Sequence, residues 1–188
     1  MGRWEPGAGD RLREAALSLY MERGFEQTMV ADIAERAGVT ARTFFRYFAD
    51  KREVLFDGTS DLEEKSLAAL DAVPVTASAL DAVAAVLDAV AEMVGGSREL
   101  ARKRQTVIMA NADLRERELI KLATLSAALA DRLRQRGTGD VEAGLAAETS
   151  IAVFRVAFSR WVTATDDHDL RDVVRDTLTR LRTLTDAG

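Results

Sequence analysis

The residues with the clearest chemical potential form a short basic segment in the first third of the chain. Residues 36–52 include five Lys or Arg residues and one acidic residue, so this segment carries a net charge of +4. The whole chain has 26 Lys and Arg against 31 Asp and Glu, a formal net charge of −5. Local positive charge attracts phosphate groups, whereas an acidic remainder limits non-specific wrapping. We therefore take residues 36–52 as a candidate nucleic-acid contact.

Most other chemistry is excluded by composition. The chain has no cysteine, and His168 is its single histidine. It can therefore form no disulfide, thiolate metal site or cysteine nucleophile, and no metal site built from several histidines. Carboxylates paired at a recognisable catalytic spacing are also lacking. We expect no enzyme, no catalytic or metal-binding residue and no cofactor.

The composition is that of a folded, globular protein. Of 188 residues, 47% are hydrophobic and 30% are charged, which argues against a disordered chain. The length allows one compact domain, or a small domain fused to a larger one. The amino terminus lacks an apolar signal core, and no uncharged apolar stretch approaches the roughly 18 residues of a membrane span. We expect a soluble, cytoplasmic protein with no membrane partner.

The elements that must position the basic segment are helices. Ala, Leu, Arg, Glu and Asp dominate between the glycines, and alternation with a period of two is rare, so the fold class is all-α. Thr40 and Asp50 are expected to cap helices, and Pro74 to end one. We expect about nine helices, at about 11–23, 30–37, 41–48, 51–72, 78–94, 98–111, 114–136, 141–165 and 170–184.

Two of these helices surround the glycine turn at Gly38. A helix of about eight residues, a tight glycine turn and a second short helix rich in phosphate-binding and base-binding side chains are typical of a helix-turn-helix. In this chain the pattern runs from Val30 to Arg52, as VADIAERAGVTARTFFRYFADKR. The sequence therefore predicts an N-terminal head of three helices.

The stretch ADIAERAGVTARTFFRYFADKREVLF resembles the DNA-binding signature of the TetR family, approximately I-A-x-x-A-G-V-S-x-x-T-L/F-Y/F-x-Y/H-F-x-x-K-x-x-L. Twelve residues over 23 positions fill it in order: Ile33, Ala34, Ala37, Gly38, Val39, Thr43, Phe44, Phe45, Tyr47, Phe48, Lys51 and Leu55. The resemblance implies a DNA-binding domain at 1–56 and a ligand-binding and dimerisation domain at 57–188. It further implies a dimeric transcription regulator, usually a repressor, whose effector moves the two DNA-binding heads.

Residue by residue, the resemblance assigns DNA contacts to Ala41, Arg42, Thr43, Phe45, Arg46, Tyr47 and Lys51. Arg42 and Arg46 can form bidentate bonds to guanine. Thr43 and Tyr47 can bond phosphates, and Lys51 supplies a point charge. The alternative for the two arginines is a solvated surface.

Two positions depart from the family pattern. Phe45 stands where tyrosine is common, so a phosphate contact is replaced by apolar packing against sugar or a thymine methyl. Met29 stands at the usual Ser/Thr N-cap, which leaves Asp32 without a capping-box partner. We expect Thr28 to act as the cap if position 29 does not.

The C-terminal part is similar to the C-terminal domain of the mycofactocin-regulator branch of this family. That resemblance rests on Leu114, Arg115, Glu118, Leu119, Leu122, Leu129 and Trp161. It implies a small, elongated, apolar effector, such as a fatty acyl-CoA. Candidate ligand-binding residues are Met93, Arg102, Ile108, Met109, Leu122, Phe154, Phe158 and Trp161, and the alternative for each apolar one is plain core packing.

The helix expected at 141–165 needs cover on more than one side. From Ser150 to Phe158 only Arg155 is charged, so the helix is apolar almost all round. A symmetry-related copy can supply the second cover. We expect a homodimer through the last two helices and hence a palindromic operator on double-stranded DNA.

Two other classes of protein remain open at this stage. One is a helical enzyme or small-molecule-binding protein that keeps a non-functional DNA-binding head, and the other is a protein-interaction adaptor without an effector. Salt-sensitive DNA binding separates the regulator from both, because phosphate contacts make affinity fall steeply with salt.

Overall fold

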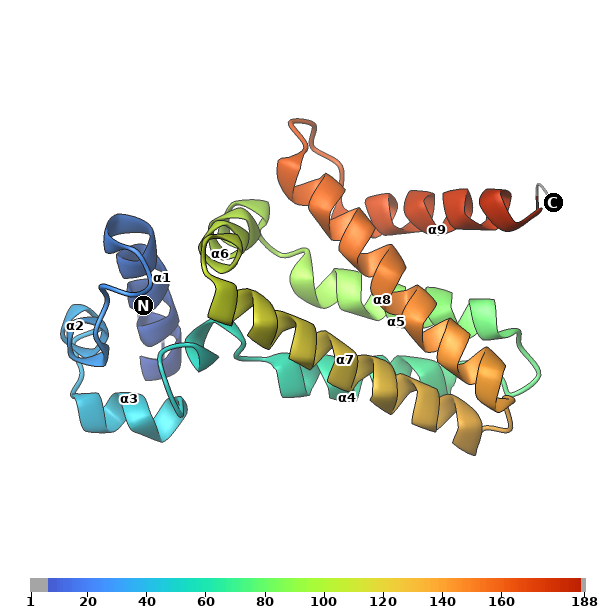
Figure 1. Ribbon diagram of the computed structural model, residues 1–188, viewed down its shortest axis with the longest axis horizontal. Helices are drawn as coiled ribbons and strands as arrows, with labels where there is room; N and C mark the ends of the chain where they lie inside the picture. The colour runs from blue at the N-terminus through green and yellow to red at the C-terminus, as the bar shows by residue number, and fades with distance from the viewer. Residues whose placement is uncertain (1–6, 187–188) are drawn as a thin grey trace, which may run out of the picture. The chain divides into compact units, whose positions relative to one another are not determined.

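The computed structural model describes residues 7–186. Within this range the fold is all-α, with nine α-helices, one short 3-10 turn (η1) and no β-strand. None of the described helices is both long and apolar enough to cross a membrane. The elements, shown in Figure 1, are α1 (Ala8–Arg23), α2 (Val30–Arg36), α3 (Ala41–Tyr47), η1 (Glu53–Leu55), α4 (Thr59–Ala72), α5 (Ala79–Val94), α6 (Arg98–Ala110), α7 (Ala112–Gln135), α8 (Asp140–Thr163) and α9 (Leu170–Asp186).

The chain forms two compact units that do not follow its linear order. The first contains the described residues up to 57 together with residues 103–118. The second contains residues 58–102 and the described residues from 119 onward. We call residues 103–118 the inserted stretch. It begins within α6 and ends within α7.

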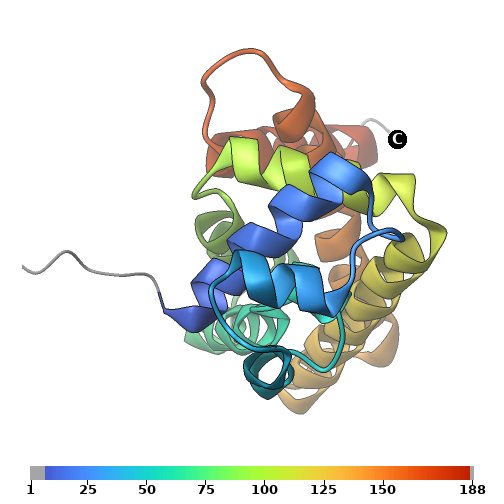
Figure 2. The same ribbon diagram turned by 90° about the vertical axis from the view of Figure 1, so that its left-hand side faces the viewer.

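The first unit is built around the buried face of α1. Leu12 and Leu19 on this face pack with Ile33 of α2 and Phe44 of α3, and all four side chains are fully buried. Ile108, near the end of α6, is equally buried in the same core, and α6 passes beside α1 in Figure 2. The three helices at the amino terminus therefore share one core with residues of the inserted stretch.

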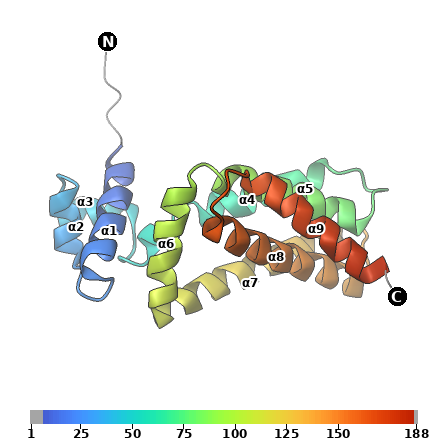
Figure 3. The ribbon, with the colours of Figure 1, turned by 90° about the horizontal axis from the view of Figure 1, so that it is seen from above.

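The second unit is a helical bundle whose core lies between α4, α5, α7, α8 and α9. Leu87 of α5, Leu129 of α7 and Leu170 of α9 are among its fully buried side chains. Figure 3 shows α9 lying along α5 and α8. At the start of α5, the Ser78 hydroxyl accepts from the Asp81 N–H and the Asp81 carboxylate accepts from the Ser78 N–H, a complete capping box.

The expected helix over 51–72 is wrong in its first part. Gly58 has a φ of +85°, a left-handed conformation that ends helical continuity, so α4 begins only at Thr59. The segment before it forms the short turn η1. The N-cap of η1 is Arg52 and not Asp50, although the Asp50 carboxylate accepts from the N–H groups of Arg52 and Glu53 at 2.7 and 3.1 Å.

The N-cap of α2 is Met29, and Thr28 does not replace it. The Thr28 side chain is buried, and its hydroxyl donates to the carbonyl of Gly24 at 2.9 Å. Asp32 nevertheless reaches back to accept from the Met29 N–H at 3.1 Å. The Met29 side chain occupies the reciprocal half of this capping box, so the expectation that Asp32 lacks a capping-box partner is wrong, although a thioether is only a weak acceptor. The expectation that Thr28 caps this helix is therefore wrong.

Candidate functional site

A Schellman motif fixes the turn between α2 and α3. The Gly38 N–H donates to the Glu35 carbonyl at 3.0 Å, and the Val39 N–H donates to the Ala34 carbonyl at 2.9 Å. Gly38 adopts a φ of +67°, which a glycine accepts without steric cost. Thr40 then caps α3 by accepting from the Thr43 N–H at 3.2 Å. The turn is thus set by local hydrogen bonds on both sides.

Helix α3 has one buried face and one exposed face. Phe44 is fully buried, and Phe48, directly after the helix, is buried with it. On the opposite side Arg42, Phe45 and Arg46 are exposed, and Phe45 has 58% of its surface free. Side chains three and four residues apart lie on one side of a helix, so these three form a single surface.

The cations of the basic segment differ in what they contact. Arg36 donates two hydrogen bonds to the Glu22 carboxylate, at 2.9 and 3.0 Å, and Arg52 pairs with Asp50 at 2.8 Å. Within the described part of the chain, Arg42 has neither a hydrogen bond nor an ion pair, and the guanidinium of Arg46 lies 5.1 Å from the centre of the Tyr47 ring. Both arginines of α3 therefore lack a carboxylate partner among the described residues, unlike Arg36 and Arg52.

Other predicted contact residues are held partly by the fold. The Thr43 hydroxyl lies 3.1 Å from that of Thr40, and Thr43 is half-buried. The Tyr47 ring lies close to the start of α1, where a Cβ added to Gly9 would meet it at 3.4 Å. Ala41 is exposed in the first turn of α3. These residues surround the surface of Arg42, Phe45 and Arg46, and their roles as DNA contacts stay predictions.

Lys51 differs from the exposed point charge that the sequence suggests. Its ammonium donates to the carbonyls of Phe25, Glu26 and Thr28, at 2.8, 3.3 and 3.0 Å. The same nitrogen lies 4.4 Å from the centre of the Phe25 ring. All three N–H donors of the ammonium are thus directed at the loop between α1 and α2.

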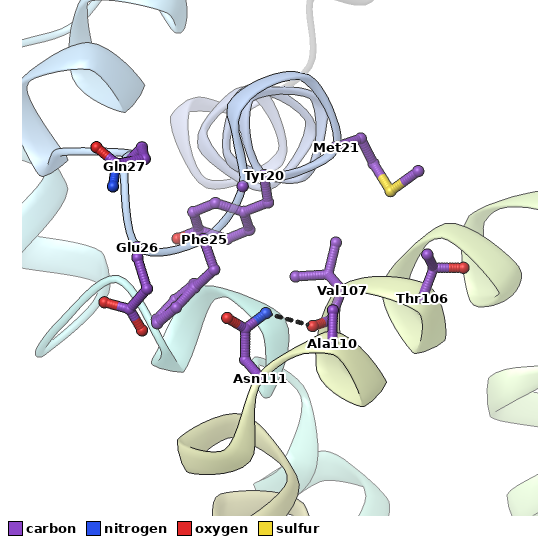
Figure 4. A pocket seen from close by; sticks show the side chains of 10 residues that line it. Tyr20, Met21, Phe25, Glu26, Gln27, Thr106, Val107, Ala110 and Asn111 are labelled. Carbon is purple, nitrogen blue, oxygen red and sulfur yellow. Dashed lines mark hydrogen bonds between the residues drawn. The ribbon is translucent and has the colours of Figure 1, made fainter.

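A cleft of about 270 Å³ lies in the first unit, between the end of α1, the following loop and the end of α6 (Figure 4). Its walls include Phe25, Glu26 and Val107, and Asn111 donates its side-chain N–H to the Val107 carbonyl at 2.7 Å. The buried Tyr20 also lines it, and burial raises the pKa of this phenol. No sequence pattern singled out this cleft, because its residues come from two segments more than 70 positions apart.

The second unit contains a small apolar cavity between α4, α5, α7 and α8. Its free volume is about 20 Å³, which is room for a single water-sized molecule. Of the eight predicted ligand-binding residues, the structure brings Leu122 and Phe154 to this cavity. Sequence reasoning missed the other lining residues, which have no pattern that distinguishes them from ordinary core: Leu62, Val86, Leu87, Val90, Leu125, Leu129, Ser150 and Ile151.

Two further candidates continue along α8 from Phe154. The ring of Phe158 stacks on Phe154 with centroids 5.6 Å apart, and Trp161 follows at 6.0 Å from Phe158. The Trp161 indole N–H donates to the His168 carbonyl at 3.1 Å. Arg102 donates from Nε to the carbonyl of Val162 at 2.7 Å.

The remaining three ligand candidates do not line the cavity. Met93 is half-buried on α5. Ile108 is fully buried in the core of the first unit, and Met109 has 54% of its surface exposed. The ligand-binding roles of all eight residues stay predictions.

Comparison with known proteins places both parts of the chain. Residues 12–57 match the family described as bacterial regulatory proteins, tetR family. Residues 77–185, more than half of the chain, match the MftR C-terminal domain. Both resemblances noted in the sequence are thereby confirmed.

Two curated relatives and one solved structure are similar to this chain. A 74-residue segment, 39% of the chain, is 43% identical to the HTH-type transcriptional regulator TcmR of Streptomyces glaucescens and spans 33% of that protein. MftR of Mycobacterium tuberculosis, named for the regulation of mycofactocin biosynthesis, is 26% identical over 165 residues, 86% of this chain and 83% of MftR. The fold is similar to that of Bacillus subtilis FadR in complex with stearoyl-CoA, with a TM-score of 0.66, 22% identity and coverage of 92% and 96%. The chain belongs to the TetR family of bacterial regulatory proteins and carries an MftR-type C-terminal domain.

Proposed function

We propose that this protein represses transcription by placing α3 in the major groove of an operator and leaves the DNA when an apolar effector binds the C-terminal bundle. The observation that carries the proposal is the exposed surface of Arg42, Phe45 and Arg46 on a helix whose other face is buried. The two guanidinium groups supply bidentate donors for guanine, and Phe45 supplies an apolar contact for sugar or a thymine methyl. Acting on bacterial DNA, the protein would work in the cytoplasm.

A two-fold dimer would deliver two such helices to one operator. Val141, Leu145 and Val156 of α8 are exposed on one side of that helix, although they are large and apolar. Burial of this side against α8 and α9 of a second copy would remove them from water. Two heads related by a two-fold axis require a palindromic operator with half-sites about 34–36 Å apart, or a multiple of that spacing.

The effector is proposed to be an elongated apolar molecule such as a fatty acyl-CoA. Support comes from the apolar lining between α4, α5, α7 and α8, and from stearoyl-CoA bound to the similar fold of FadR. A cavity of about 20 Å³ is far smaller than typical ligand sites of roughly 300–1,000 Å³. An acyl chain can enter only if these helices separate, so effector binding would select a conformation different from this one.

The test is DNA binding measured by fluorescence anisotropy, with duplexes covering the region upstream of the protein's own gene and a scrambled duplex as control. We expect preference for one palindromic segment, a steep loss of affinity with added salt, and release by stearoyl-CoA but not by coenzyme A alone. By reciprocity, the operator should weaken acyl-CoA binding by the same factor. Equal affinity for every duplex, or acyl-CoA turnover, would contradict the proposal.

A further inference from the structure

We propose that Lys51 is a positioning residue that fixes the orientation of α3 by binding the loop between α1 and α2, and that it does not act by meeting a DNA phosphate. The inference concerns the same DNA-binding surface and rests on the proposed function for its DNA readouts. It assigns Lys51 a role different from the phosphate contact that the family resemblance implies.

The geometry around the ammonium carries the proposal. An ammonium group has three N–H donors, and those of Lys51 have three carbonyl acceptors, on Phe25, Glu26 and Thr28. The Phe25 ring, 4.4 Å away, adds a cation–π contact on a further side. A phosphate oxygen could bind this nitrogen only by displacing at least one of these carbonyls.

The backbone of Lys51 is held as well as its side chain. The hydroxyl of the buried Tyr20 donates to the Lys51 carbonyl at 2.6 Å. Residue 51 is thus bound to the end of α1 through its main chain and to the following loop through its side chain. We call this double attachment of Lys51, through its carbonyl and its ammonium, the joint. A residue that contacts DNA needs a free terminal group, and the ammonium of Lys51 is already bound.

The joint spans the whole helix-turn-helix. The three carbonyls lie just before α2 begins at Val30, and Lys51 lies just after α3 ends at Tyr47. One side chain therefore ties the two ends of the helix-turn-helix together. Loss of the ammonium would leave three carbonyls without this donor and would allow α3 to turn relative to α1, which moves Arg42 and Arg46 away from their base contacts.

Three roles for Lys51 predict different behaviour of Lys51→Met, which keeps the stem and removes the charge. If Lys51 is a positioning residue, the Lys51→Met substitution should lower affinity for the preferred duplex about tenfold, the size of one lost base contact. Affinity for a scrambled duplex should change little. If Lys51 contacts a phosphate, the substitution should lower affinity for both duplexes alike and reduce the slope of log affinity against log salt by about 0.9. A purely structural residue would lower the melting temperature without changing discrimination between duplexes.

The experiment measures anisotropy titrations over a range of KCl concentrations, on a duplex selected from a random library by the unmutated protein and on a scrambled duplex. Lys51→Arg restores the charge but not the joint, because a planar guanidinium cannot direct three donors at three converging carbonyls. We expect it to remain deficient in discrimination. Arg52→Gln is the matched control, since it removes one exposed charge at the next position and should leave discrimination intact.

Hydrogen exchange of the free protein supplies a readout that does not need DNA. In Lys51→Met, amides of residues 25–28 and 41–48 should exchange faster, whereas those of α9 should not change. Unchanged exchange at 25–28 and 41–48, full rescue by Lys51→Arg, or a shallower salt slope with retained discrimination would each overturn the proposal. If the unmutated protein selects no duplex at all, the proposed function fails, and the exchange result still decides whether Lys51 is the joint.

Discussion

At the scale of single residues, the charge offered to DNA is much smaller than the segment's composition suggests. Arg36 and Arg52 are bound to Glu22 and Asp50, and the Lys51 ammonium is held by three neutral carbonyls, so the cationic groups that can turn toward DNA are those of α3. Exposed ion pairs add little to stability, but they do neutralise the field that a phosphate would meet. Binding should therefore depend most on the arginines of α3.

The Arg42→Ala variant tests base reading at this scale. We expect it to lose about 1–3 kcal/mol of discrimination at one base pair of the operator, because a bidentate contact to guanine is removed. Titrations against duplexes with single base-pair changes measure the effect. The control is Arg36→Ala. The Arg36 guanidinium of the unmutated protein already binds Glu22, so its removal should lower affinity for all duplexes only slightly. Equal losses on all duplexes for Arg42→Ala would remove its reading role.

The Glu22–Arg36 pair predicts a defined acid dependence. Hydrogen bonds from Arg36 and Ser18 lower the pKa of Glu22 from 4.5 to about 2. A carboxylate with a lowered pKa stabilises the fold above its unfolded-state pKa, and this contribution is lost as the pH falls through its folded-state pKa. Glu22→Gln should thus be less stable than the unmutated protein at neutral pH. In urea unfolding, the difference should shrink as the pH falls from about 4.5 toward about 2; a constant difference would contradict it.

At the scale of elements, the helix-turn-helix is determined almost entirely by local signals. A glycine in the left-handed conformation ends α2 and a threonine begins α3, and both can be recognised in the sequence. The break at Gly58 could not be foreseen in the same way, because an isolated glycine is also tolerated inside a helix. The expectation that Thr28 caps α2 failed for a related reason. Thr28 is buried and its hydroxyl donates to the carbonyl of Gly24, and such burial is a tertiary effect that local sequence does not reveal.

The cap of α2 offers a stabilising substitution. Met29 is 67% exposed and has the extended backbone of an N-cap, with φ −97° and ψ 153°. In Met29→Ser a hydroxyl oxygen replaces the weak thioether as the acceptor for the Asp32 N–H, and the Asp32 carboxylate already accepts from the N–H of residue 29. We expect a gain of about 1 kcal/mol in the free energy of unfolding over Met29→Ala, the matched control that cannot cap. Thermal melts of both variants measure it, and equal stability would show that the hydroxyl makes no cap.

At the scale of the whole molecule, composition and periodicity predicted an all-α fold of about nine helices, and the described residues 7–186 form nine. The family was indicated by the resemblance of residues 31–56 to the TetR signature, and not by composition. Composition and periodicity could not predict which core each helix enters, because apolar stripes look alike wherever they are buried. Ile108 is an example: its sequence context allowed either a pocket wall or plain core packing, and the side chain lies in the core of the first unit. Most residues that line the cavity between α4, α5, α7 and α8 were missed for the same reason.

The proposed dimer makes a prediction about the exposed side of α8. Val156 is 54% exposed there, and Val156→Asp would place an unpaired carboxylate in the interface. We expect the dissociation constant of the dimer to rise by at least about a hundredfold, or roughly 3 kcal/mol. Light scattering after size-exclusion chromatography measures it. Val75→Asp, at a valine 74% exposed between α4 and α5, is the control and should stay dimeric.

The membership of residues 103–118 in the first unit has a consequence for dissection of the protein. Val107, Ile108 and Leu114 are buried against the amino-terminal helices, so a fragment that stops at Asp57 would expose the core that they cover. Arg104 and Arg117 would be lost with them, along with their bonds to the Leu55 carbonyl and to Glu53. Chimeras that exchange only the first 57 residues between relatives would therefore join mismatched halves of one core, and a graft needs both stretches to come from the same parent.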